Sequence, residues 1–269
     1  MQKDEGVEAS NTLLDALRAD KVVGMMSIRL TRGAEIASLM RISGFETVYV
    51  DMEHSTFSVA EAAQVCVACL GVGVTALVRV AVIDEAQVSR VLDAGSMGII
   101  APHVRDAAQA RRLVDLCKFP PLGRRSSVAL LPQLGYRSLS QTQIAEVMNR
   151  TTTVIAMIED AEALSKVEEI AAVPGVDILF VGCSDLSASL GIQGTQDETQ
   201  LDAAVDAVIV ACKTFGKVAA IGGLARRPEL LRRYVSKGAR LVSMGTDISF
   251  LMDGAKRQAT VVRALSEIT

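Results

Sequence analysis

The sequence predicts a (β/α)8 TIM barrel of the α/β class, and three observations support that prediction. The chain has 269 residues, about the length that one such barrel needs. Eight short apolar runs, rich in Val and Ile, alternate with longer amphipathic stretches, which is the pattern of buried parallel strands joined by helices. Glycines that can adopt the left-handed conformation of a C-cap follow the helical stretches; they are Gly44, Gly71, Gly95, Gly175, Gly216 and Gly238. A doubly wound open sheet is the alternative, but no G-x-G-x-x-G motif follows the first apolar run.

The apolar runs place the predicted strands along the chain. The strands are expected at residues 22–28, 47–50, 75–78, 98–101, 154–158, 178–181, 218–221 and 241–244. The stretches between them repeat apolar residues at helical spacing, and the clearest are residues 59–70, 85–92, 107–117, 161–172, 201–215 and 228–236. We therefore expect one domain over residues 1–269, in which residues 1–20 form a polar segment and a leading helix.

One connection is longer than the others. Residues 119–136, between the fourth strand and the helix before the fifth, contain three prolines, two glycines and the pair Arg124 and Arg125. A long ordered loop inside a compact domain is usually functional or a subunit contact. We expect one of these two roles for this loop.

The composition excludes several classes of function. Hydrophobic residues make up 50% of the chain, which excludes intrinsic disorder. The 28 Lys and Arg residues do not outnumber the 31 Asp and Glu residues, and we expect no nucleic-acid partner, because such a partner requires a clustered basic face. The longest uncharged run, residues 62–78, is divided by Gly71 and Gly73 into segments too short to span a bilayer. We therefore expect no membrane partner either.

The cysteines and the amino-terminal residues bear on the cellular compartment. The chain has five cysteines, an odd number scattered among apolar residues. Cys66 and Cys69 form a C-x-x-C pair, but without a second pair or a nearby histidine we expect core cysteines rather than a zinc or redox site. The first ten residues are acidic and polar and do not resemble a signal peptide. We therefore expect a reducing, cytoplasmic location.

The chemistry of such a barrel is performed at the carboxyl ends of its strands. Those positions hold Asp51-Met-Glu53-His54 after the second strand, Arg79 after the third, Glu159-Asp160 after the fifth and Ser184-Asp185 after the sixth. Asp93 lies at the end of the helix after the third strand, just before the fourth. We expect these carboxylates, the imidazole and the guanidinium to converge on one mouth of the barrel.

Glu159 and Asp185 end adjacent predicted strands, and their carboxylates can point at a common centre. Two carboxylates without Cys or His select a hard divalent ion, Mg²⁺ or Mn²⁺, with water completing the octahedron. The alternative is a pair of acids that cap helices, with Asp185 as the N-cap of the helix that follows it. The residues alone leave both interpretations open.

His54 and Arg79 are the other candidates for catalysis. A lone histidine is often structural, but His54 lies at a strand end among acids that could orient its ring and tune it as a general base. His103 is the second choice because no acid immediately precedes it. Arg79 closes an apolar strand and needs an anionic partner, which is either a carboxylate or enolate ligand or a structural acid. The turn at residues 182–185 offers backbone N–H groups for a carboxylate.

Together these motifs resemble the HpcH/HpaI family of metal-dependent pyruvate aldolases, which includes 4-hydroxy-2-oxoheptanedioate aldolase and 2-dehydro-3-deoxyglucarate aldolase. The resemblance covers residues 24–265. It rests on Ala34-Glu35-Ile-Ala, Gly44-Phe, Val50-Asp51-Met-Glu53-His54-Ser, Leu92-Asp93-Ala-Gly95, Ile100-Ala-Pro102, Pro120-Pro-Leu-Gly123-Arg-Arg125, Ile158-Glu159 and Val181-Gly182-Cys-Ser-Asp185-Leu-Ser, in this order and spacing.

The resemblance implies a barrel of the phosphoenolpyruvate/pyruvate type whose last helix packs on a neighbouring subunit of a homo-oligomer, either a trimer or a hexamer built as a trimer of dimers. It implies a divalent ion (Mg²⁺ or Mn²⁺, with Co²⁺ as a third option) held by Glu159 and Asp185. The substrates would be a 2-oxo acid and an aldehyde. Arg79 would steady the keto or enolate oxygen, and the backbone near Ser184 and Asp185 would hold the substrate carboxylate. His54 would move the proton, with Asp93 nearby.

The sequence also departs from the family pattern. Met52 stands where many members have Gly, Asp160 where many have Thr, and Cys183-Ser184 where many have Pro-Ala or Pro-Thr. Residues 126–132 replace a Gly-containing stretch, and we expect this change to bear on substrate choice. Two other functions remain as alternatives: a lyase that acts on acyl-CoA esters, like the citrate-lyase β relatives, and a non-catalytic barrel that serves as a binding or assembly subunit.

Overall fold

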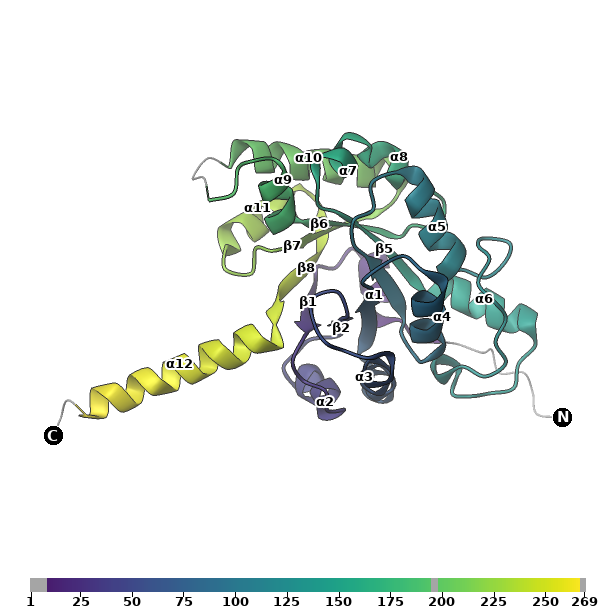
Figure 1. Cartoon of the computed structure of the whole chain (residues 1–269), viewed down its shortest axis with the longest axis horizontal. Coiled ribbons are helices and arrows are strands. Elements are labelled where there is room, and N and C mark those ends of the chain that lie inside the picture. The colour runs from purple at the N-terminus through teal and green to yellow at the C-terminus, as the bar shows by residue number, and fades with distance from the viewer. Residues whose placement is uncertain (1–8, 195–197, 267–269) are drawn as a thin grey trace.

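The computed structural model of the chain, which describes residues 9–194 and 198–266, closes eight parallel strands into a barrel in chain order (Figure 1). The predicted fold is therefore confirmed, and the open doubly wound sheet is excluded because β8 pairs with β1. The strands are β1 (Val23–Ile28), β2 (Thr47–Asp51), β3 (Thr75–Arg79), β4 (Gly98–Ala101), β5 (Thr153–Ile158), β6 (Ile178–Gly182), β7 (Val218–Gly222) and β8 (Ala239–Thr246).

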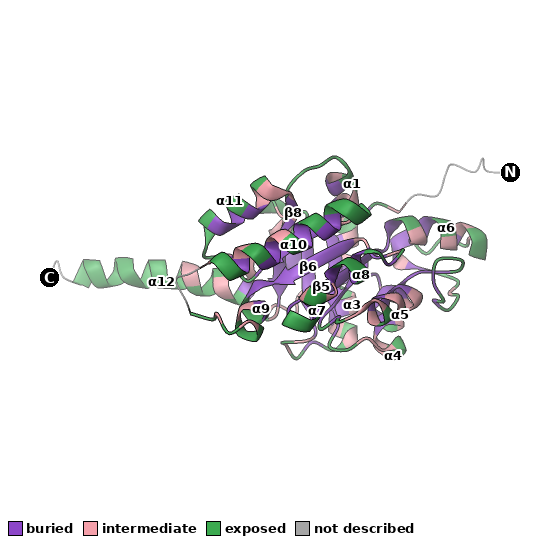
Figure 2. Ribbon diagram, turned by 90° about the horizontal axis from the view of Figure 1, so that it is seen from above, coloured by how far each residue is buried: buried purple, intermediate pink, exposed green. Residues whose placement is uncertain are grey.

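The helices surround the barrel, and most turn a buried face toward the strands and an exposed face outward (Figure 2). They are α1 (Thr12–Arg18), α2 (Glu35–Ile42), α3 (Val59–Val72), α4 (Glu85–Asp93), α5 (Ala107–Cys117), the short 3₁₀ helix η1 (Pro132–Leu134), α6 (Gln141–Thr151), α7 (Ala161–Ser165), α8 (Val167–Ala171), α9 (Cys183–Ser189), α10 (Thr199–Phe215), α11 (Pro228–Lys237) and α12 (Asp247–Ser266). The predicted leading helix corresponds to α1. Residues 1–8 of the predicted polar segment lie outside the described residues.

Two details of the helix prediction are wrong. Helix α3 continues through Gly71, and its C-cap is Gly73, whose φ of +71° is the left-handed conformation that favours glycine. Residues 161–172 form two short helices rather than one, because the backbone of Lys166 leaves the helical region between them.

The core has two layers. Inside the barrel, side chains from alternate strand positions fill the lumen, and Leu13 and Leu17 of α1 close its amino-terminal end. A larger layer of Val, Ile, Leu and Ala lies between the strands and the helices. All five cysteines are free and buried, which confirms the prediction of core cysteines. Burial raises the pKa of the Cys69 thiol to about 12 and also raises that of Cys66, and neither thiol is reactive at neutral pH.

The long connection at residues 119–136 lies at the amino-terminal end of the strands. The side chain of Gln133 donates to the carbonyl oxygens of Leu92 and Ser96, just before β4 begins. Phe119, Leu131 and Leu134 pack against α6, which leads into β5. Within one chain the loop therefore lies opposite the carboxyl ends of the strands, and its altered residues 126–132 do not reach the mouth there.

Helix α12 leaves the barrel at the end of β8 and extends away from it (Figure 1). Apart from its first residues it is exposed over most of its length (Figure 2). Large apolar side chains are among those exposed, including Ile248, Phe250, Leu251, Met252, Val261, Val262 and Leu265. Within the described part of the chain, no helix combines the length and the apolar character that crossing a membrane requires.

Candidate active site

A pocket of about 190 Å³ opens at the carboxyl ends of the strands. Four of the predicted site residues line it together, and they come from the carboxyl ends of three strands, β2, β3 and β6. They are His54, Arg79, Ser184 and Asp185. The other residues of the wall are Arg29, Tyr49, Met157, Phe180, Gly182, Gly222, Gly223 and Ser243. The convergence expected at the mouth therefore exists for these four residues.

One wall of the pocket is an ion-pair network centred on Asp51. The parallel register places Asp51 directly beside Arg79 on β2 and β3. The carboxylate, which is fully buried, accepts hydrogen bonds from Arg79 Nε at 3.0 Å and Nη2 at 2.6 Å, and from Arg29 Nε at 2.6 Å. Burial opposes ionisation, but the bonds and charge of Arg79 prevail and lower the pKa of Asp51. Of the two partners foreseen for Arg79, the structure shows the structural acid.

Glu53 extends this network toward the centre of the mouth. Its carboxylate is largely buried, with Oε2 2.9 Å from Arg79 Nη1 and Oε1 3.1 Å from His103 Nε2. The Nε2 atom of His54 is 3.8 Å from Glu53 Oε2, which is longer than a hydrogen bond. Glu53 therefore connects the Arg79 side of the pocket to His103.

Glu159 lies at the end of β5 and is almost completely buried. It accepts a 2.6 Å hydrogen bond from the backbone N–H of His103, whose Nδ1 is 2.9 Å away. Burial raises the pKa of the Glu159 carboxyl, and the charges of Glu53 and Asp185 act in the same direction, against the His103 contacts. A buried carboxylate that repels neighbouring acids is a group that a cation would stabilise.

The backbone of Gly182 makes room for that carboxylate. A Cβ atom at this position would be 3.0 Å from both Cβ and Oε2 of Glu159. Asp185 follows in the third position of α9, whose N-cap is Gly182 itself. The interpretation of Asp185 as an N-cap residue is therefore wrong, and its side chain is left to line the pocket.

The donor set fits a hard divalent ion that keeps several waters. Within residues 9–194 and 198–266, no three His, Cys, Asp or Glu side chains converge as a closed metal cage. Two carboxylates, Glu159 and Asp185, lie near enough for their charges to interact, although only Asp185 is among the residues that line the pocket. Mg²⁺ typically binds proteins through one or two carboxylates and retains water for substrate oxygens to replace. The residues present therefore fit such an ion, with Glu159 and Asp185 as its holders.

The two histidines have different surroundings. The side chain of His54 is 52% exposed, and among the described residues no acid is within hydrogen-bond distance of its ring. His103 instead lies between Glu53 and Glu159, with a φ of +55° that is unusual for a residue other than glycine. The acids that hold His103 come from neighbouring strands rather than from its own segment, which is why a scan along the chain ranked it second.

The structure does not bring Asp93 to this pocket within one chain. Asp93 ends α4, and helices of the barrel run opposite to its strands, so that this residue lies at the amino-terminal end of β4. There its Oδ1 accepts a 2.8 Å bond from Arg125 Nη2. Asp160 is not among the residues that line the pocket either. Its carboxylate caps α7 by accepting from the N–H of Ala163, and it pairs with Arg105 at 2.8 Å.

Sequence reasoning missed several lining residues. Arg29 directly follows β1 and obeys the same strand-end rule that found Arg79, and this signal was present in the sequence. Tyr49, Phe180 and Ser243 lie within strands, where their types do not distinguish a pocket wall from the core.

Comparisons with known proteins agree with this geometry. Residues 29–253 match the family model of the HpcH/HpaI aldolase/citrate lyase family. The chain is 39% identical to a 4-hydroxy-4-methyl-2-oxoglutarate aldolase of Hapsidospora irregularis, over 96% of this chain and 97% of that protein. It is 40% identical to a protein of the same name from Chaetomium globosum, over 82% of each. A 2-dehydro-3,6-dideoxy-6-sulfogluconate aldolase of Pseudomonas putida is 34% identical, over 84% of this chain and 87% of that protein.

A solved structure supports the same assignment. The HpcH/HpaI aldolase of Desulfitobacterium hafniense superposes with a TM-score of 0.87 at 27% identity, covering 93% of this chain and 96% of the other. The chain therefore belongs to the HpcH/HpaI aldolase/citrate lyase family, and the predicted enzyme class, a carbon–carbon lyase of the aldolase type, is confirmed.

Proposed function

We propose that this member of the family is a divalent-metal-dependent aldolase that cleaves 4-hydroxy-2-oxo acids to pyruvate, or a close 2-oxo acid, and a second carbonyl compound, and that it also catalyses the reverse condensation. The observation that carries the proposal is a pair of acids whose charges interact, the buried Glu159 and the exposed Asp185. Asp185 lines the pocket together with the buried guanidinium of Arg79. The names of the relatives direct the first substrate trial to 4-hydroxy-4-methyl-2-oxoglutarate.

The pocket offers positive charge where the reaction develops negative charge. Cleavage of the C3–C4 bond leaves an electron pair on the pyruvate half as an enolate. An ion held by Glu159 and Asp185 would supply Lewis acidity at the keto oxygen. Arg79, held rigidly by Asp51, would donate to the same oxygen, and the first-turn amides of α9 near Ser184 would hold the substrate carboxylate.

His54 is the proposed proton carrier. The C4 hydroxyl must lose its proton as the C3–C4 bond breaks, and C3 of the enolate must later gain one. His54 is an exposed imidazole at the pocket wall, and in the part of the chain that the structure describes no acid is within hydrogen-bond distance of it. It can accept the first proton and return it, directly or through water. Because no acid fixes its ring, the substrate or a neighbouring subunit would have to orient it.

We also propose that the enzyme works as a homo-oligomer, a trimer or a hexamer, in the cytoplasm. The exposed apolar residues of α12 support the assembly, since a 20-residue helix with such a surface is stable when it packs against a neighbouring copy. If Asp93 assists His54, it must do so from a second copy, because within one chain it lies at the opposite end of the barrel.

The test follows deuterium exchange into the methyl group of pyruvate by NMR, with Mg²⁺ or Mn²⁺ and then with EDTA. Exchange that requires the ion would support enolate formation without knowledge of the second substrate. The Glu159→Gln variant, which keeps the shape of the side chain, should bind the ion weakly and lose exchange while its circular dichroism is unchanged. Absence of exchange in a metal-loaded wild-type protein would contradict the proposal and favour an acyl-CoA ester or a non-catalytic role.

A further inference from the structure

Arg29 is fixed at both ends in the wall of the active-site pocket. It directly follows β1, and its backbone N–H donates to Asp247 Oδ1 at 3.0 Å. The same carboxylate receives the N–H groups of Leu30 and Thr31 at 2.9 and 2.7 Å. At the other end of the side chain, Nε donates to Asp51 at 2.6 Å. The guanidinium is therefore held in one place before any ligand arrives.

The outer edge of this guanidinium has no partner. Of the three nitrogens of the Arg29 guanidinium, only Nε makes a hydrogen bond or ion pair within the described residues, and the side chain is 30% exposed. Arg29 lines the active-site pocket and also an adjoining cavity of about 430 Å³ that shares Tyr49, Gly223 and Ser243 with it. Its two Nη groups are thus available where the active-site pocket opens into that cavity.

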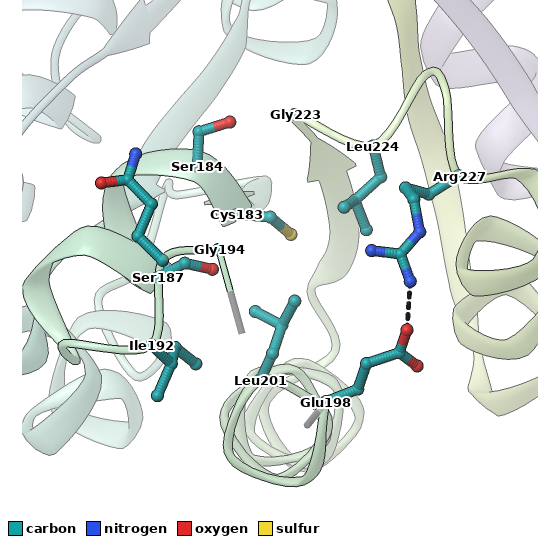
Figure 3. A pocket seen from close by; sticks show the side chains of 11 residues that line it. Cys183, Ser184, Ser187, Ile192, Gly194, Glu198, Leu201, Gly223, Leu224 and Arg227 are labelled. Atoms are coloured by element: carbon teal, nitrogen blue, oxygen red, sulfur yellow. Dashed lines mark hydrogen bonds and ion pairs between the residues drawn. The ribbon is translucent and has the colours of Figure 1, made fainter. Parts of the chain in front are cut away.

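The other arginines that line these pockets are bonded to acids, except Arg226, whose side chain is 81% exposed and whose nearest acid is Asp253 at 3.7 Å. All three nitrogens of the Arg79 guanidinium contact Asp51, Glu53 or the sulfur of Met157. Arg227 lines the adjoining cavity and also a third pocket, where it pairs with Glu198, as Figure 3 shows. It also bonds to Glu229 at 2.6 Å. Arg29 therefore has the pocket's free pair of parallel guanidinium donors, which is the arrangement that suits a carboxylate.

We propose that Arg29 binds a carboxylate on the acceptor half of the substrate, and that the enzyme therefore uses a 2-oxo acid, rather than a simple aldehyde, as its aldol acceptor. This inference rests on the proposed aldolase function and specifies its substrate class. The pyruvyl half already has the ion, Arg79 and the α9 amides as its proposed partners. A second carboxylate, on the carbon that carries the hydroxyl group, would lie toward the edge of the pocket where Arg29 is free.

The reaction balances with such a substrate. In 4-hydroxy-4-methyl-2-oxoglutarate the C4 hydroxyl gives up its proton, its oxygen forms a C=O bond to C4, and the C3–C4 bond breaks. The electron pair of that bond becomes the enolate of the first pyruvate, and C3 then takes up one proton. C4, with its methyl group and its carboxylate, leaves as the second pyruvate. No oxidant, reductant or other reactant is needed.

The test uses two ligands that cannot undergo cleavage, 2-oxoglutarate and 2-oxopentanoate, which differ only in the terminal carboxylate. Their dissociation constants are measured by calorimetry with the Mg²⁺-loaded enzyme. We expect the wild type to bind the diacid at least about tenfold more tightly, because a charged hydrogen-bonded pair contributes that much. Arg29→Met should abolish the preference and leave 2-oxopentanoate binding nearly unchanged, and Arg29→Lys should restore part of it.

Arg226→Met is the matched control, because Arg226 lines the adjoining cavity but its nearest acid is Asp253 at 3.7 Å. It should keep the preference. No preference in the wild type, or a preference removed by Arg226→Met and kept in Arg29→Met, would overturn the assignment. If Arg29→Met weakened the binding of both ligands by the same factor, Arg29 would be only a structural partner of Asp51, and this too would overturn the assignment. Pyruvate deuterium exchange, measured separately on the wild type, reports on the proposed function itself.

Discussion

Replacement of Asp51 by Asn should destabilise the barrel more than a change of one atom suggests. Oδ1 of Asp51 accepts from Arg79 Nε and from the N–H groups of Glu53 and His54, and Oδ2 accepts from Arg79 Nη2 and Arg29 Nε. All five partners are donors. Whichever way the Asn amide turns, its NH₂ group faces at least two donors, and the buried guanidinium of Arg79 loses one of its two counter-charges and keeps only Glu53.

The size of the effect follows from the bonds lost. Loss of two charge-assisted hydrogen bonds, each contributing about 1.5–3 kcal/mol, agrees with the cost of about 3–5 kcal/mol for removing one partner of a buried pair. We expect the free energy of unfolding, measured by urea denaturation at constant protein concentration, to fall by about 3–5 kcal/mol. Asp15→Asn is the control, since Asp15 and its partner Arg18 are both exposed, and it should change stability by less than about 0.5 kcal/mol.

The pH dependence gives a second test of the same network. Because the pKa of folded Asp51 is lowered, its ionised form contributes stability above the unfolded value of about 3.9. That contribution is lost as pH falls below about 4 through the folded pKa. The stability gap between wild type and Asp51→Asn should therefore narrow below pH 4. A gap under about 1 kcal/mol at pH 7, or a gap that stays constant down to pH 3, would refute this account of the network.

Three further predictions concern the ion and the assembly. Gly182→Ala should weaken Mg²⁺ binding by about 10- to 100-fold, because the added Cβ would be 3.0 Å from Oε2 of Glu159. Calorimetry measures this affinity. Gly71→Ala is the control, since the added Cβ would have open space around it, and the Mg²⁺ affinity should stay unchanged. Leu251→Asp, on the exposed face of α12, should lower the mass measured by light scattering, whereas an unchanged mass would exclude α12 from the interface. If Asp93 acts on a neighbouring copy, His54→Ala and Asp93→Asn proteins refolded together should regain activity that neither has alone, and failure to regain it would confine Asp93 to its own chain.

The strands were the most predictable part of this fold. A strand buried on both faces must be apolar along its whole length, and every apolar run predicted as a strand overlaps an observed one. The errors occur where local sequence permits two outcomes. Residues 70–74 offer Gly71 and Gly73 as C-caps, and the helix ends at Gly73, whose N–H bonds back to Leu70 while Val74 bonds to Cys69. The break between α7 and α8 at Lys166 could not be predicted, because no proline or glycine lies at that point of the sequence.

The order of the elements along the chain determines part of the candidate site, namely the end of the barrel at which each residue lies. In a β/α repeat all strand ends point to one face of the barrel and all helix ends to the other, whatever the side chains are. That rule brings His54, Arg79 and Asp185 together and, applied strictly, also places Asp93 at the far face, so that its assignment to the same mouth of one chain conflicts with the topology.

The order of the elements does not determine which acid pairs with each histidine or arginine. His103 contacts Glu53 and Glu159, which lie 50 and 56 positions away along the chain. Asp51 pairs with Arg79, which is directly opposite it in the sheet, but also with Arg29 from the strand on its other side. These choices depend on side-chain reach across strands. One consequence is that Asp51 accepts from Nε of both arginines, while the Nη groups of Arg79 also contact Asp51 and Glu53. Of these two arginines, Arg29 is the one whose Nη groups have no partner among the described residues. The same acid that holds the catalytic guanidinium therefore also orients the one that we propose selects the substrate.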